Sequence, residues 1–139
     1  MSKSSYDRYM DFILDYYSAF YRHYRRCQRT AHVDATRYPD GSIIYTRQAF
    51  LDELDIFVSE WNASEGKIRL LLPSSVLEIH ENAVECFNVF HELVKSQPDD
   101  IVTEEYRLKR VDAFKNIESV KIDLEIRLRE FLRTERLLK

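Results

Sequence analysis

Glycine and proline are almost absent from this chain, which has two of the former and three of the latter among 139 residues. These residues are the strongest breakers of regular secondary structure, so a chain with so few of them has few places to turn. A β-sandwich with many tight turns, a collagen-like repeat and a Gly-rich phosphate-binding loop are therefore not expected. The sequence instead predicts a small number of long helices.

The five glycine and proline positions fall into three groups. Pro39 and Gly41 form the first group, Gly66 and Pro73 the second, and Pro98 stands alone. These three breaks divide a chain of ordinary single-domain length into four segments with helical periodicity. We therefore predict an all-α, four-helix bundle-like single domain. It spans residues 1–139, with helices at about 5–33, 47–62 with an extension to 72 left open, 76–96 and 104–138.

The first predicted helix carries apolar residues around most of its circumference. One stripe has the spacing of a single helical face, and a second stripe runs beside it. Polar residues are confined to a narrow seam, so we expect the central helix of the domain or part of a subunit interface. Ser4 or Ser5 can cap its N-terminus. The stripes are Tyr9, Ile13, Tyr16, Phe20, Tyr24 and Cys27, and Met10, Leu14, Tyr17 and Tyr21.

The middle of the chain contains two more helical segments and one segment of a different kind. Residues 34–45 combine a Pro-Asp-Gly turn with a β-prone Ile-Ile-Tyr run, so we predict a small hairpin or an ordered loop there. Ser75 and Glu78 have the spacing of a capping box, which predicts that Ser75 opens the third helix. The second helix is marked by a stripe of Phe50, Leu54, Phe57 and Trp61.

The fourth predicted helix is longer than its neighbours and has two apolar stripes. At 1.5 Å per residue it would be about 52 Å long, against about 31 Å for the third helix. The part of the fourth helix that extends beyond the third must pack against the 34–45 segment, the first helix or a second protomer. The end to be covered carries Leu128, Phe131 and Leu132, and the weaker second stripe is Leu108, Val111, Ile122 and Ile126.

Charge is nearly balanced, with 21 Lys and Arg against 24 Asp and Glu, so strong nucleic-acid binding by the whole chain is not expected. The densest basic cluster lies late in the first helix and is interleaved with tyrosine. Such a cluster could grip phosphates and stack bases, or it could form salt bridges to the acidic second and third helices. The cluster is Arg22, Arg25, Arg26 and Arg29.

Arg26 and His32 are separated by five residues, and in this they resemble the Arg-x4–6-His pattern of HEPN-type ribonucleases, which are also helical. The resemblance covers these two residues. It implies that Arg26 and His32 would be RNA-cleaving residues in a dimer cleft.

No metal or cofactor motif is present in the sequence. None of the four histidines follows a glutamate by three positions, so the Glu-x-x-His motif of di-iron bundles is missing, and no His-Glu-x-x-His occurs. Cys27 and Cys86 do not have the spacing of metal ligands, and we interpret both as small buried hydrophobic residues. The sequence therefore favours a non-enzymatic protein without metal or cofactor.

The uninterrupted apolar runs are short, so we predict no membrane span, no signal peptide and a cytoplasmic location. We interpret the chain as a helical protein–protein interaction or assembly module, self-associating as a homodimer or binding another protein. The alternative is a nucleic-acid-binding or RNA-cleaving helical protein that uses the basic cluster. Whether the second stripes form an interface or an internal core is left open. The predicted partner-binding residues are Leu108, Val111, Ile122, Ile126, Phe131, Tyr17 and Tyr21.

Overall fold

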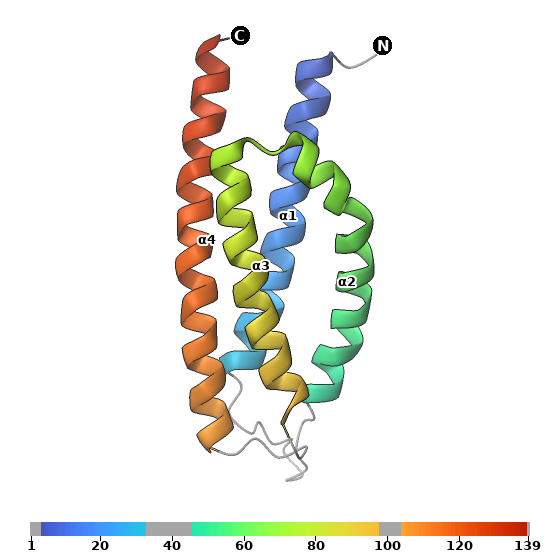
Figure 1. Ribbon diagram of the computed structural model, residues 1–139, viewed down its shortest axis with the longest axis vertical. Helices are drawn as coiled ribbons and strands as arrows, with labels where there is room; N and C mark the ends of the chain where they lie inside the picture. Colours follow the sequence, from blue (N-terminus) through green and yellow to red (C-terminus); the bar gives the residue numbers. More distant parts are fainter. Residues whose placement is uncertain (1–3, 33–45, 98–103, 139) are drawn as a thin grey trace, which may run out of the picture.

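The computed structural model describes residues 4–32, 46–97 and 104–138, and all the regular secondary structure in these ranges is α-helical. Four helices pack side by side and run alternately up and down the molecule (Figure 1). The predicted all-α, four-helix architecture is therefore confirmed. The predicted hairpin or loop at 34–45 lies outside the described residues. The helices are α1 (Ser5–His32), α2 (Thr46–Leu71), α3 (Ser74–Lys95) and α4 (Glu104–Leu138).

The helix ends agree with the sequence at α1 and differ at α3. The backbone N–H of Asp7 donates to Oγ of Ser4 at 3.1 Å, so Ser4 caps α1. The second helix continues through Gly66 to Leu71, which resolves the extension left open by the sequence.

The capping box predicted at Ser75 is wrong. The N-cap of α3 is Pro73, and no side chain bonds the free N–H groups there. The ring of Pro73 holds φ at −56°, so the helix starts directly after it, and Ser75 already lies inside the first turn. The N–H groups of Val76 and Leu77 donate to the carbonyl of Pro73 instead, at 3.0 and 2.8 Å.

The four helices are not packed equally. The most extensive contact is between α3 and α4, followed by α1 with α4, whereas α2 touches α1 and α3 more sparingly. In Figure 1, α2 accordingly stands apart from the other three helices along much of its length. A core rich in aromatic side chains lies between them. Its largest apolar side chains with less than 2% exposure are Phe20, Phe90, Phe114, Ile13, Ile117 and Leu124.

The surplus length of α4 is matched by α1. Both helices extend together beyond the connection between α2 and α3, at the top of Figure 1. There the ring of Tyr9 meets the ring of Phe131 edge-on, with centroids 5.9 Å apart, and Leu132 packs against the core. Among the described residues, the first helix therefore covers this end of α4.

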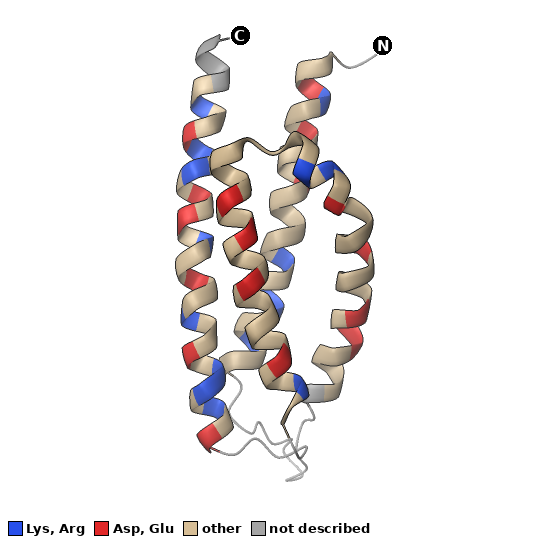
Figure 2. Cartoon of the chain, in the orientation of Figure 1, with Lys and Arg blue, Asp and Glu red and all other residues tan. Residues whose placement is uncertain are grey.

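Charge is unevenly distributed over the surface. Figure 2 shows a row of acidic residues along the front of α3, whereas α4 carries both signs throughout. Within the described ranges, no helix combines the length and apolar character that crossing a lipid bilayer requires. The acidic row consists of the exposed residues Glu78, Glu81, Glu85 and Glu92.

Candidate functional site

The basic cluster of α1 is partly neutralised by α2. Nε of Arg26 lies 3.1 Å from a carboxylate oxygen of Glu53, and Arg29 approaches the same oxygen at 3.9 Å. Arg25 donates to the side-chain oxygen of Gln28 within α1. Arg22 instead lines a cleft between α1 and α2. Two of the four arginines are therefore held by salt bridges within the chain.

The structure does not bring Arg26 and His32 together. Arg26 turns toward Glu53 on α2. His32 lies against α4, where its ring meets Phe114 edge-on with centroids 5.4 Å apart. Because α2 and α4 flank α1 on different sides, the two side chains do not share a cleft within one chain.

The seven predicted partner-binding residues fall into two groups. Leu108, Ile122 and Ile126 are 51%, 48% and 48% exposed on α4, and Tyr21 is exposed on α1. The other three are at least partly covered within the chain. Val111 is half-buried, Phe131 packs on Tyr9, and the hydroxyl of Tyr17 donates to Glu125.

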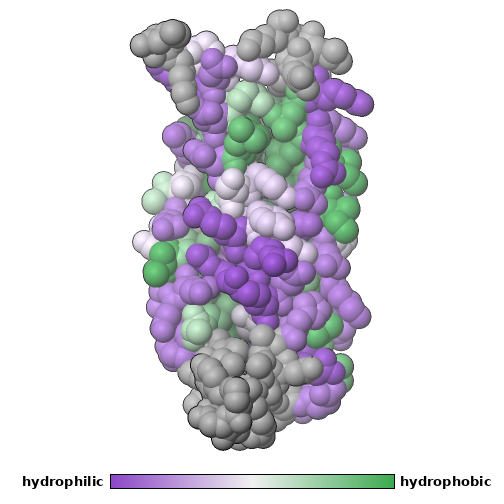
Figure 3. Space-filling model, turned by 180° about the vertical axis from the view of Figure 1, so that it is seen from behind, coloured by the Kyte–Doolittle hydropathy of each residue, from purple (hydrophilic) through white to green (hydrophobic). Residues whose placement is uncertain are grey.

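A shallow apolar groove runs between α1 and α4 near their shared end. It has a volume of about 170 Å³ and includes Leu14, Tyr17, Leu128 and Leu132 in its walls. Figure 3 shows hydrophobic surface in the upper part of this face and a hydrophilic band below it. The groove therefore adjoins the half of α4 that carries Ile126.

Two histidines and a cysteine that no sequence motif connects meet in the core. Nε2 of His23 lies 2.6 Å from Nε2 of His91, and Sγ of Cys27 lies 3.7 Å from Nε2 of His23. The three atoms all lie within 4.8 Å of one another, and all three side chains are buried. The ring of Phe57 stacks on His23 at a centroid distance of 3.7 Å.

Burial controls the protonation of this cluster. It lowers the pKa of His23 to about 2, helped by the neighbouring His91 and Arg26, and it lowers the pKa of His91 to about 4. Burial also raises the pKa of the Cys27 thiol well above its usual value. All three groups are therefore neutral near pH 7, and one of the two facing Nε2 atoms carries the hydrogen that it donates to the other.

A second buried histidine contact lies next to the cleft between α1 and α2. The hydroxyl of Tyr16 and Nδ1 of His80 are 2.9 Å apart. Nε2 of His80 lies 3.5 Å from a carboxylate oxygen of Glu65, a distance too long for a good hydrogen bond. Burial lowers the pKa of His80 although Glu65 opposes this, and burial raises the pKa of Tyr16. Tyr16 therefore stays protonated.

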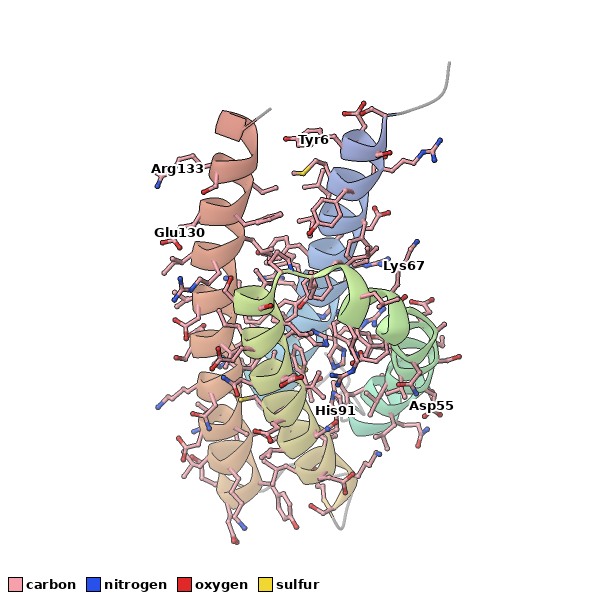
Figure 4. All side chains as sticks on the ribbon, turned by 45° about the horizontal axis from the view of Figure 1, so that its top comes forward. Tyr6, Asp55, Lys67, His91, Glu130 and Arg133 are labelled. Atoms are coloured by element: carbon pink, nitrogen blue, oxygen red, sulfur yellow. The ribbon has the colours of Figure 1, made fainter. Side chains whose placement is uncertain are left out.

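The cleft itself has a volume of about 600 Å³. Its floor includes Tyr16 and Trp61, and its rim carries side chains of both charges, such as Asp15 and Lys67. Figure 4 shows Lys67 on the α2 side of the molecule, close to the connection that leads into α3. The cleft combines an aromatic floor with a polar rim, which suits ligand binding in general without selecting one class of ligand.

A third buried polar group is the side chain of Arg110 on α4, which is only 1% exposed. It donates to the backbone carbonyl of Thr30 at 3.0 Å and to the side-chain oxygen of Gln97 at 3.1 Å. No carboxylate among the described residues forms an ion pair with it. Thr30 is in the last turn of α1, so the guanidinium satisfies one of that helix's unpaired carbonyls and faces the negative end of its dipole.

One spacing in the sequence indicates the buried cluster in retrospect. His23 and Cys27 are four residues apart on α1, which places both on one face of a helix. His91 could not be added to them from spacing, because it reaches the cluster from α3. The contact of Tyr16 with His80 depends on the pairing of helices in the same way.

Comparisons with protein-family models, with curated proteins and with solved structures found no match to this chain. Its function is therefore inferred from the arrangement of its own residues.

Proposed function

We propose that this protein is a helical assembly module that forms a homodimer through the outer face of α4. The observation that carries the proposal is the half exposure of Leu108, Ile122 and Ile126 on the face opposite the core. Leu108 and Ile126 are separated by about five full helical turns, so they point in the same direction. Exposed large apolar side chains at both ends of one helix face, with Asp112, Lys115 and Ser119 between them, are typical of a surface that a partner covers.

The order of residues along this face supports a second copy of the chain as the partner. Leu108 and Ile126 each lie nine residues from position 117, the midpoint of the segment between them. If two copies of α4 pack antiparallel about a two-fold axis at that midpoint, Leu108 of one copy meets Ile126 of the other. A self-complementary patch of this kind is what an isologous dimer requires.

One pair of opposite charges on α4 supports the same arrangement. The first turn of α4 contains Glu104 and Glu105, and its last turns contain Arg129 and Arg133. Glu105 and Arg129 are also equally distant from the proposed axis, so antiparallel pairing sets the carboxylate of Glu105 opposite the guanidinium of Arg129. In Figure 4 the side chain of Arg133 points away from α1, toward the outer side of α4.

Sedimentation velocity at micromolar concentration tests the proposal. The wild type should sediment near 33 kDa, twice the 16.7 kDa of one chain. The double variant Ile122→Lys/Ile126→Lys should sediment as a monomer, because four lysines would then face the symmetric interface. Ile56→Lys is the matched control, since Ile56 is 60% exposed but lies on α2; it should remain dimeric.

A charge exchange tests the antiparallel geometry separately. Arg129→Glu should weaken the dimer, and adding Glu105→Arg should restore it, because opposite charges would again face each other across the axis. A wild type that stays monomeric up to roughly 100 μM would overturn the proposal. If the Ile122→Lys/Ile126→Lys variant still sediments as a dimer, the outer face of α4 is not the interface.

A further inference from the structure

We propose that His23, Cys27 and His91 form a binding site for a soft monovalent metal ion, with Cu(I) as the physiological candidate. The site is separate from the outer face of α4, and the inference does not depend on self-association. One thiol and two imidazoles within 4.8 Å of one another form a soft set of ligand atoms. Thiolate ligands in particular select ions such as Cu(I).

Two helices hold the ligands in place. His23 and Cys27 are one turn apart on α1, and His91 is on α3. The ring of Phe57 stacks on His23 with an interplanar angle of 5°, and the ring of Phe87 meets the same imidazole edge-on at 4.8 Å. These contacts orient Nε2 of His23 toward the other two ligand atoms and keep the imidazole from rotating.

The distances suit a shared ion after a small adjustment. With the bond lengths of zinc sites as a guide, a sulfur and a nitrogen on one three-coordinate ion lie about 3.7 Å apart. The separation of Cys27 Sγ and His23 Nε2 is 3.7 Å. The two imidazole nitrogens are 2.6 Å apart and would open to about 3.5 Å on binding. A rotation of His91 at the edge of the core can supply this movement.

The charge of the site selects a monovalent ion. Binding replaces the proton of the Cys27 thiol: one metal ion enters, one S–M bond and two N–M bonds form, one S–H bond breaks and one proton leaves to solvent. The hydrogen between the two Nε2 atoms moves to Nδ1 of the ring that carries it, so both Nε2 lone pairs are free for the ion and both imidazoles stay neutral. With Cu(I) the site is neutral before and after, and the copper keeps its oxidation state. A divalent ion would leave one buried positive charge near Arg26, with no carboxylate ligand in the cluster as described.

A route to the site exists between α2 and α3. His91 lines a cavity of about 180 Å³ together with Trp61, Phe87 and Asn88. Figure 4 shows His91 on the side of α3 that faces α2. Because α2 packs sparingly on its neighbours, a small outward movement of α2 would admit the ion. The aromatic rings around His23 exclude water, so the site holds an ion rather than activating a bound water.

Anaerobic titration of the reduced, metal-free protein with Cu(I), against a chromophoric Cu(I) chelator as competitor, tests the site. We expect one ion per chain, and X-ray absorption of the copper should show one sulfur and two nitrogen neighbours. Cys27→Ala and His91→Gln should each weaken binding by more than about 100-fold, because each removes a ligand. Circular dichroism should show that both variants remain helical.

Cys86→Ser is the matched control, since Cys86 is the other free cysteine and lies on α3 outside the cluster. This variant should bind Cu(I) as tightly as the wild type. The proposal is overturned if the wild type takes up no stoichiometric Cu(I), or if binding follows Cys86. The X-ray absorption spectrum of the wild type is a test that needs no variant. A copper ion with no nitrogen neighbours would show that the histidines are not ligands, and would overturn the proposal. Equal or tighter binding of Zn(II) at these residues would overturn the choice of a monovalent ion.

Discussion

The imidazoles of His23 and His91 face each other through their Nε2 atoms, 2.6 Å apart in the core, and burial holds both neutral. At most one proton can lie between the two nitrogens. Nδ1 of His23, the other nitrogen of this ring, is buried and has no hydrogen-bond partner among the described residues. The core therefore contains a pair of bases that cannot take up protons without opening.

This pair predicts that the metal-free protein loses stability in mild acid. Unfolded histidine has a pKa near 6.5, whereas the folded values are about 2 and about 4. Below pH 6.5 the unfolded state binds more protons than the folded state, so the free energy of unfolding falls as the pH falls. Between pH 7.5 and 5 we expect a loss of about 2 kcal/mol for each histidine.

Urea denaturation at the two pH values, in the presence of chelators, measures this loss. His91→Gln should reduce the pH dependence by about 2 kcal/mol, because one titrating group is removed. An unfolding midpoint that is equal at pH 7.5 and 5 would contradict the prediction.

Gly66 predicts a stabilising substitution. It lies inside α2, and a Cβ added there would meet no atom within 4 Å. Gly66→Ala should therefore raise the free energy of unfolding by about 0.5–1 kcal/mol, since alanine restricts the unfolded chain and favours the helix. The reverse change at the exposed Ala63 of the same helix, Ala63→Gly, should lower it by a similar amount. Chemical denaturation of both variants checks the pair, and a lowered midpoint for Gly66→Ala would count against it.

Arg110 predicts a large loss of stability when it is truncated. Arg110→Ala removes both donated hydrogen bonds and leaves a cavity, so we expect a loss of about 3 kcal/mol or more. Arg110→Met keeps most of the aliphatic volume and should lose at least about 1 kcal/mol less. Lys109→Met, at an exposed ion pair with Glu105, should change stability by less than about 1 kcal/mol. Equal losses for the two Arg110 variants would show that filling the cavity contributes nothing.

The helical stripes were readable in the sequence because they depend on local spacing. The stripe containing Ile13 and Phe20 is buried, as its 3–4 periodicity predicts. The capping box at Ser75 failed for a local reason too, because a proline two positions earlier starts the helix sooner than the serine could. Local patterns compete with one another, and the sequence does not rank them.

The candidate sites could be predicted from the sequence only in part. The spacing of Leu108, Ile122 and Ile126 predicted a second apolar stripe on α4, and these side chains are exposed. The meeting of His23 with His91 joins residues 68 positions apart on two helices. Such a pair depends on how the helices are rotated and shifted against each other, which spacing within one helix does not define.

The scarcity of glycine and proline determined, by itself, that this chain forms a few long helices with three breaks. Backbone turning is a local property, so composition and periodicity were enough to predict it. The tertiary structure alone decided that α1 covers the surplus of α4 and that Arg110 donates to the C-terminal turn of α1. It also decided that two histidines and a cysteine meet in the core. These outcomes depend on contacts between distant segments, which are selected by the packing of side chains across helices.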